Sequence, residues 1–219
     1  MSVVTPDGGL TALGYGLCAA AAVLLVLAAA FFHAKSGSAK KLSTKQLVFC
    51  AAAMALAFVA SYIKVFSLPY GGSVTLFSML FICLIGYWYG VGPGIMTGLA
   101  YGILQFLQEP YVLSLFQVCC DYVLAFAGLG LAGLFHKSKN GLVKGYILGI
   151  LIRGAFHALG GYLYWMDYMP ENFPQSLAAL YPIIYNYSYI LAEGVLTVIV
   201  ISLPPVSKAL AQVKRNALS

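Results

Sequence analysis

Seven apolar stretches, most of them long and all separated by short polar loops, constrain the fold of this chain more than any other feature. They cover residues 10–32, 46–66, 74–89, 94–107, 112–135, 142–165 and 182–203. A helix needs about 20 residues to cross the hydrocarbon core of a bilayer, and five stretches reach that length. The third and fourth are shorter and are divided by the glycine-rich run 90–94. They could be two brief or tilted spans or a partly re-entrant pair; we count two spans, which predicts an all-α integral membrane protein.

The composition excludes an ordinary soluble domain. Hydrophobic residues form 62% of the chain and charged residues 8%, and the mean hydropathy is +0.90. Soluble domains carry roughly a quarter charged residues. The net charge of +6 would suggest an anionic partner in a soluble protein, but here its distribution indicates membrane orientation. We expect the lipid bilayer as the partner of the apolar surface and no nucleic acid.

The basic residues fall in three loops or tails that alternate with acidic loops. They are Lys35, Lys40, Lys41 and Lys45; Lys137, Lys139 and Lys144; and Lys208, Lys214 and Arg215. The intervening loops hold Glu109, Asp167 and Glu171, and Lys64 stands at a helix end where it can snorkel. Seven spans place all three basic clusters on one side, which identifies that side as the cytoplasm. The N-terminus is then outside and the C-terminus inside.

The first stretch differs from a cleavable signal peptide. Its leader carries Asp7 and no lysine, and its apolar region is longer than that of a signal sequence. We therefore expect a retained N-terminal transmembrane anchor helix over residues 1–33 and a basic cytoplasmic linker over 34–45. A six-helix membrane core over 46–205 and a cytoplasmic tail over 206–219 follow.

Five polar or aromatic residues in or directly beside the last three stretches predict a common site. An acidic group inside a bilayer is costly and normally faces a partner, a ligand or water. Asp121 lies about nine residues into its stretch, which is roughly 13 Å deep at 1.5 Å per residue. The same reasoning puts His157, Trp165, Tyr181 and Asn186 in the outer half of the membrane. Their convergence predicts an outward-facing pocket suited to a small organic cation.

Each of these residues has a structural alternative. Asp121 could pair with a buried helix terminus or with Lys64. His157 could bond a carbonyl of a neighbouring helix, since such polar contacts hold membrane helices together. Trp165 and the tyrosines around it could form an ordinary interfacial aromatic belt.

Other polar side chains within the stretches are weaker candidates. Arg153, one turn from His157, could pair internally, and Glu193 lies deeper in the last stretch. The five cysteines show no CxxC spacing, and only one histidine is well inside a stretch, so we expect no metal site.

Several fragments, taken in order, resemble the thiamine-specific S-components of energy-coupling-factor vitamin transporters. They are LPYGGSVTLFSMLFICLIGYWYG at 68–90, YGILQFL at 101–107, QVCCDYVLAFAGLGLAGLF at 117–135, RGAFHALGGYLYW at 153–165 and YPIIYNYSYILAEG at 181–194. The resemblance covers roughly residues 45–205. It implies a six-helix S-component core, to which the N-terminal helix is an addition.

The resemblance also implies a ligand and its contacts. Thiamine would be captured with high affinity by Asp121, Tyr122, His157, Gly161, Trp165, Tyr181 and Asn186. A permanently cationic thiazolium suits a carboxylate and aromatic faces, and a flat aminopyrimidine suits stacking. Thiamine would be cargo, and the resemblance implies no cofactor and no enzymatic activity.

Uptake into a prokaryotic cell would need energy from partners. The sequence has no GxxxxGK[ST] phosphate loop, so a transmembrane coupling protein and two ATPase subunits would supply it. Ala51 and Ala55, or Ala53 and Ala57, form small-xxx-small pairs on the first core helix that could dock the coupling protein. Internal packing is the alternative for these alanines.

Two other functions fit parts of the pattern. One is an S-component for another vitamin or for a precursor such as a hydroxymethylpyrimidine. The other is an intramembrane enzyme that uses Asp121 and His157 as acid and base. The enzyme hypothesis lacks a nucleophile motif or a metal-binding set.

Overall fold

The computed structural model describes residue 5, residues 10–16, residue 20 and residues 42–219. Most of the predicted N-terminal anchor over 1–33 and most of the linker over 34–45 lie outside the described residues.

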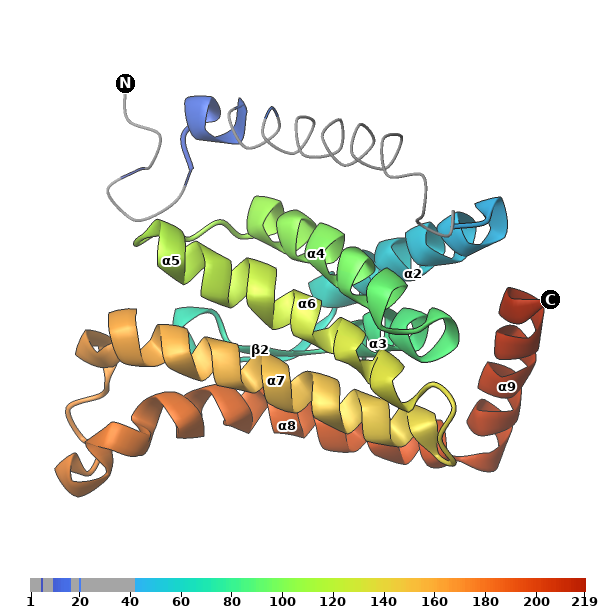
Figure 1. The fold of residues 1–219 in the computed structure, drawn as a ribbon. Coiled ribbons are helices and arrows are strands. Elements are labelled where there is room, and N and C mark those ends of the chain that lie inside the picture. The colour runs from blue at the N-terminus through green and yellow to red at the C-terminus, as the bar shows by residue number, and fades with distance from the viewer. Residues whose placement is uncertain (1–4, 6–9, 17–19, 21–41) are drawn as a thin grey trace.

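The described core consists of long helices and one short β-hairpin (Figure 1). Its elements are α2 (Thr44–Tyr62), β1 (Lys64–Ser67), β2 (Ser73–Thr75), α3 (Ser78–Tyr89), α4 (Val91–Gln108), α5 (Leu115–Val118), α6 (Ala125–Leu129), α7 (Gly141–Tyr164), α8 (Tyr181–Ser202) and α9 (Pro204–Leu218). A π-helical turn, Cys119–Leu124, joins α5 to α6, and a 3₁₀ segment, Gly130–Phe135, continues α6. Shorter 3₁₀ turns lie at Pro69–Gly71, Met166–Tyr168 and Gln175–Leu180.

Four helices of the described region are long and apolar enough to cross a membrane. They are Thr44–Tyr62, Leu115–Phe135, Gly141–Tyr164 and Gln175–Ser202. With α3 and α4 they form a six-helix core, and the all-α membrane class is confirmed. The predicted third and fourth spans are separate helices that meet at Gly90, whose φ is 92°. Because α3 has only 12 residues, it is about 18 Å long and shorter than a bilayer core.

The segment between α2 and α3 corrects the sequence prediction. The apolar stretches 46–66 and 74–89 suggested helix throughout, but α2 ends at Tyr62 and α3 begins only at Ser78. Between them, β1 and β2 pair antiparallel, with Phe66 opposite Val74. Val65 and Phe66 favour a strand, and the Pro69–Gly72 segment supplies the turn. Lys64 therefore begins a strand instead of ending a helix.

Helix α3 lies at the centre of the bundle, and glycines bring its neighbours close. Most of its residues are buried, including Met79, Ile82 and Ile85. A Cβ added at Gly94 or Gly130 would overlap the backbone of the other helix. The α4 backbone therefore contacts the Gly130–Phe135 segment directly, as small residues permit in membrane helix packing.

The two candidate alanine pairs lie on different faces of helix α2. Ala53 and Ala57 are buried in the core, whereas Ala51 and Ala55 are exposed. Only Ala51 and Ala55 are available to a partner, because Ala53 and Ala57 already pack inside the bundle. The helix itself begins with a capping box formed by Ser43 and Gln46.

The predicted C-terminal tail is a helix. After the extended residue Leu203, α9 turns steeply away from the direction of α8 and crosses one end of the bundle (Figure 1). Leu210 and Ala217 pack onto the core cluster. Two prolines at its start suit a first helical turn, where backbone N–H groups need no helical partner.

Candidate functional site

A cavity of about 450 Å³ opens between the hairpin, α4, α7, α8 and the rod from Leu115 to Phe135. This volume lies within the range of small-molecule sites. All seven ligand contacts predicted from the sequence line it: Asp121, Tyr122, His157, Gly161, Trp165, Tyr181 and Asn186. The structure thus brings these residues together from three helices. Their contact with a ligand stays a prediction.

Asp121 occupies the π-helical turn within the rod. One carboxylate oxygen, Oδ2, accepts a hydrogen bond from Gln117 Nε2 at 2.8 Å. The other, Oδ1, lies 3.3 Å from His157 Nδ1, and the side chains of Asp121 and His157 are 14% and 13% exposed. π turns often mark functional sites in helices. Of the proposed partners, neither Lys64 nor a helix terminus pairs with this carboxylate in the described contacts.

Arg153 fixes the orientation of the His157 ring. Arg153 Nε donates to His157 Nε2 at 3.2 Å, and its guanidinium carbon lies 4.6 Å from the Phe126 ring centroid. Because a guanidinium cannot accept a hydrogen bond, Nε2 must be the acceptor and Nδ1 must carry the proton. His157 then donates from Nδ1 to Asp121. A polar chain runs from Arg153 through His157 and Asp121 to Gln117.

Two consecutive glycines let α7 lie close to Asp121 and to α8. A Cβ on Gly160 would lie 2.7 Å from Asp121 Oδ1, and one on Gly161 would lie 2.8 Å from Pro182 Cβ. Gly160 therefore leaves room for the carboxylate, and Gly161 leaves room for α8. Gly161 lines the cavity mainly through the backbone approach that it permits.

Asn186 is held by a hydrogen-bond set of its own. Its Nδ2 donates to Pro182 O at 2.9 Å and to His157 O at 3.3 Å. Its Oδ1 accepts from Tyr189 OH at 3.0 Å. Both amide protons are engaged, so the second lone pair of Oδ1 is the group left for a ligand donor.

Aromatic rings form the wall of the cavity nearest the α7 C-terminus. The Trp165 ring centroid lies 4.8 Å from that of Tyr111 and 5.1 Å from that of Tyr168. The hydroxyls of Tyr111 and Tyr168 are 3.2 Å apart. Tyr181 continues the wall on α8, and Tyr122 donates to Glu109 O at 2.7 Å. Such rings can stack on a flat ligand or face a cation.

The hairpin forms another wall and is fastened to α8 by Glu193. This carboxylate is 2% exposed. Its Oε2 accepts from Thr75 N at 2.8 Å and Thr75 Oγ1 at 2.7 Å, and Oε1 accepts from Met79 N at 3.4 Å. The last bond satisfies an N–H of the first turn of α3, which has no side-chain cap of its own. Glu193 thus acts structurally, one turn below the cavity.

Three further contacts hold the hairpin at the mouth of the cavity. Tyr185 OH donates to Pro69 O, and Gly72 N donates to Tyr185 OH at 3.4 Å. Lys64 pairs with Glu109 at the end of α4. The hairpin is therefore connected to both α4 and α8.

Several lining residues were missed by the sequence reasoning. They include Gln117, Tyr111, Tyr185, Tyr189 and a cluster of Ser61, Gln105 and Gln108. Gln117 stands four residues before Asp121, which puts both on one helix face. Tyr181, Tyr185, Tyr189 and Glu193 recur every four residues and form one stripe on α8. The hairpin residues carried no such signal, because residues 64–66 and 74–75 were assigned to apolar helical stretches and 67–73 to the loop between them.

The arrangement can bind a flat, cationic molecule. It offers one carboxylate, several aromatic faces and amide or hydroxyl groups inside a partly closed cavity. In the part of the chain that the structure describes, no group of three histidine, cysteine, aspartate or glutamate side chains could hold a metal ion.

This chain is similar to thiamine transporter proteins in its family match, in its sequence and in its fold. A family model described as thiamine transporter protein matches residues 47–212. The thiamine transporter ThiT of Bacillus subtilis (strain 168) is 31% identical over 156 residues, covering 63% of this chain and 77% of that protein. ThiT of Lacticaseibacillus paracasei is 27% identical over 173 residues, covering 70% and 81%. The solved structure of ThiT from Listeria monocytogenes shares the fold, with a TM-score of 0.58, 24% identity and coverage of 73% and 94%.

Proposed function

Because this chain belongs to the thiamine transporter protein family, we propose that it captures thiamine as the substrate-binding subunit of an energy-coupling-factor transporter. The observation that carries the proposal is the Asp121 carboxylate, fixed by Gln117 and His157 beside an aromatic wall. Thiamine combines a cationic thiazolium with a flat aminopyrimidine, and the cavity presents complementary groups for both.

The lining side chains divide the recognition between them. Asp121 attracts the cationic or amino groups of thiamine, and the Arg153–His157 pair keeps its carboxylate oriented. Trp165 offers its ring for stacking, and Tyr122 and Tyr181 close the sides. Asn186 Oδ1 accepts from a ligand N–H or O–H, while Gly161 lets α8 bring that amide close.

Transport needs energy from other subunits. The sequence contains no phosphate-binding loop of the GxxxxGK[ST] type, so a transmembrane coupling protein and two ATPases power the cycle. Support for docking comes from Ala51 and Ala55, which present a small, exposed face on α2. Thiamine is captured outside, the whole subunit topples in the membrane, and thiamine is released inside.

The orientation and domain plan complete the proposal. The basic clusters place the N-terminus outside and the C-terminus in the cytoplasm. Residues 1–33 anchor the chain, 34–45 link the anchor to the core, and 46–205 bind the substrate.

Tryptophan fluorescence tests the proposal in the detergent-purified protein. The chain has two tryptophans: Trp165 in the cavity, and Trp88, which is 8% exposed and packs against Phe49. Thiamine should quench the fluorescence of the wild type and of Trp88→Phe, but not of Trp165→Phe. Calorimetry should show binding weakened by about tenfold or more in Asp121→Asn, because loss of a charged partner costs about 1.5–3 kcal/mol.

The rival functions give different results. No thiamine binding by a folded wild type would refute the proposal and direct the search to other vitamins and precursors. Tighter binding of a neutral hydroxymethylpyrimidine, unaffected by Asp121→Asn, would indicate a precursor transporter. Recovery of a chemically altered ligand would favour the enzyme that uses Asp121 and His157.

A further inference from the structure

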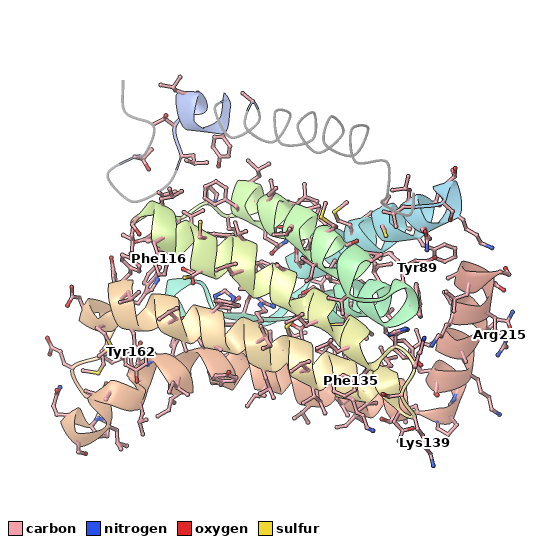
Figure 2. All side chains as sticks on the ribbon, in the orientation of Figure 1. Tyr89, Phe116, Phe135, Lys139, Tyr162 and Arg215 are labelled. Atoms are coloured by element: carbon pink, nitrogen blue, oxygen red, sulfur yellow. The ribbon has the colours of Figure 1, made fainter. Side chains whose placement is uncertain are left out.

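One end of the bundle is strongly basic. Figure 2 labels Lys139 and Arg215 there, while Phe116 and Tyr162 lie toward the other end. Seven described basic residues belong to the elements of this end: Lys45, Lys137, Lys139, Lys144, Lys208, Lys214 and Arg215. The described acidic residues lie elsewhere, at Glu109, Asp121, Asp167, Glu171 and Glu193. The transport site uses none of these seven cations.

A second cavity lies at this end, between α9 and the adjoining ends of α3, α7 and α8. Its volume is about 1020 Å³. Leu142 and Val143 of α7, together with Ile201 of α8, give it apolar walls, and Lys214 and Arg215 of α9 give it two cations. It is therefore amphiphilic, with positive charge contributed by one helix and hydrocarbon by the others.

The two cations have weak protein partners. Lys214 Nζ lies 3.8 Å from the centroid of the Tyr87 ring, and Arg215 donates to the neutral side chain of Gln212. Neither takes part in the ion pairs found among the described residues. Both can therefore bind an anion, and an arginine binds phosphate oxygens especially well.

Helix α9 is fastened in place, so the cavity does not depend on a ligand to form. Tyr89 OH donates to Ala217 O at 3.1 Å. Lys45 Nζ donates to Ser219 Oγ at 2.9 Å. These bonds tie the last turn of α9 to the ends of α3 and α2.

We propose that this cavity binds one anionic phospholipid of the surrounding membrane. Its phosphate contacts Lys214 and Arg215, and its acyl chains follow the apolar surface of α7 and α8. The position of α9 favours a lipid over a soluble phosphate. The helix crosses the ends of the membrane-spanning helices (Figure 1). The proposed orientation puts these ends beside the cytoplasmic head groups, and basic amphipathic helices in that position attract anionic lipids. This site is independent of the proposed thiamine site.

Native mass spectrometry of the detergent-purified protein tests the proposal, with phosphatidylglycerol and phosphatidylcholine titrated separately. We expect one phosphatidylglycerol to be retained more tightly than any phosphatidylcholine. A direct, partly exposed ion pair between a basic side chain and the lipid phosphate strengthens binding by up to about fivefold. Lys214→Gln/Arg215→Gln should therefore weaken phosphatidylglycerol binding by up to about 25-fold.

A charge-matched control is available on the same end. Lys139→Gln/Lys208→Gln removes two cations that do not line the cavity, and it should retain nearly wild-type affinity. Since Lys214 also packs on Tyr87, the exposed Arg215→Gln alone is measured as well, and a loss of up to about fivefold is expected.

Three outcomes would overturn the proposal. Equal retention of the two lipids by the wild type would remove the anionic specificity. Equal losses in both double variants would show that diffuse surface charge, and not the cavity, holds the lipid. Glycerol 3-phosphate that competes as strongly as the lipid would show a site for a soluble phosphate.

Discussion

Substituting Gly160 by alanine should lower the affinity for thiamine more than it lowers the stability of the fold. The added Cβ would lie 2.7 Å from Asp121 Oδ1, against about 3.4 Å for an ordinary contact. The carboxylate must therefore retreat by about 0.7 Å (3.4 − 2.7). Gly160 and His157 are three residues apart on the same face of α7, so this retreat also moves the carboxylate away from the imidazole.

The expected magnitude follows from the hydrogen bond that is lost. His157 Nδ1 and Asp121 Oδ1 are 3.3 Å apart, and a further 0.7 Å brings them to about 4.0 Å, beyond hydrogen-bonding distance. A bond to a charged group contributes about 1.5–3 kcal/mol. Thiamine affinity should fall about 10- to 100-fold. The helix itself gains about 0.5–1 kcal/mol from replacing glycine by alanine, which offsets about a third of the loss in stability.

Isothermal titration with thiamine and thermal unfolding in the same detergent measure the two quantities. Gly92→Ala is the matched control, because it is also helical and a Cβ there meets nothing within 4 Å. It should bind thiamine like the wild type. A folded Gly160→Ala protein with wild-type affinity would refute the idea that the position of Asp121 sets binding. A protein that no longer folds would refute the expected separation of affinity from stability.

Three further substitutions test other parts of the structure. Glu193→Gln places an amide N–H2 opposite the Met79 N–H, so thermal unfolding should show that the fold loses about 1–3 kcal/mol of stability. Thiamine release, followed by stopped flow, should become faster. Unchanged stability and release rate would contradict the role of Glu193 in holding the hairpin on α8. Gly130→Ala forces a Cβ into the α4 backbone and should cost about 1–3 kcal/mol of stability. Thermal unfolding should therefore occur at a lower temperature, while thiamine affinity shows no specific change. Lys64→Gln breaks the partly exposed pair with Glu109 and should change stability by less than about 1 kcal/mol, which a denaturation series would show.

Much of the site could be predicted because helix rise and charge bias are local properties. The distance of Asp121 from the end of its stretch predicts its depth, and the basic loops predict the direction of each helix. His157 and Asn186 could be placed at similar depth in the same way. The resemblance to a family then selected the ligand and added Tyr122 and Gly161.

The hairpin could not be predicted from the same signals. The strand residues Val65, Phe66 and Val74 are apolar, so they extended the helical stretches in the hydropathy pattern. What keeps them out of α2 and α3 is the turn between β1 and β2 together with Glu193, which is 118 residues away from Thr75 in the chain. A contact across that separation leaves no local periodicity.

The sequence by itself determined the membrane class and the order of the helices, and it predicted the depth of the polar residues, since each follows from composition and spacing along one segment. The tertiary structure alone decided which way each helix face points. Glycine contacts such as Gly160 against Asp121 and Gly130 against Gly94 set the rotation of the helices about their axes. That rotation buries Ala53 and Ala57, exposes Ala51 and Ala55, and turns Asp121, His157 and Asn186 toward one cavity.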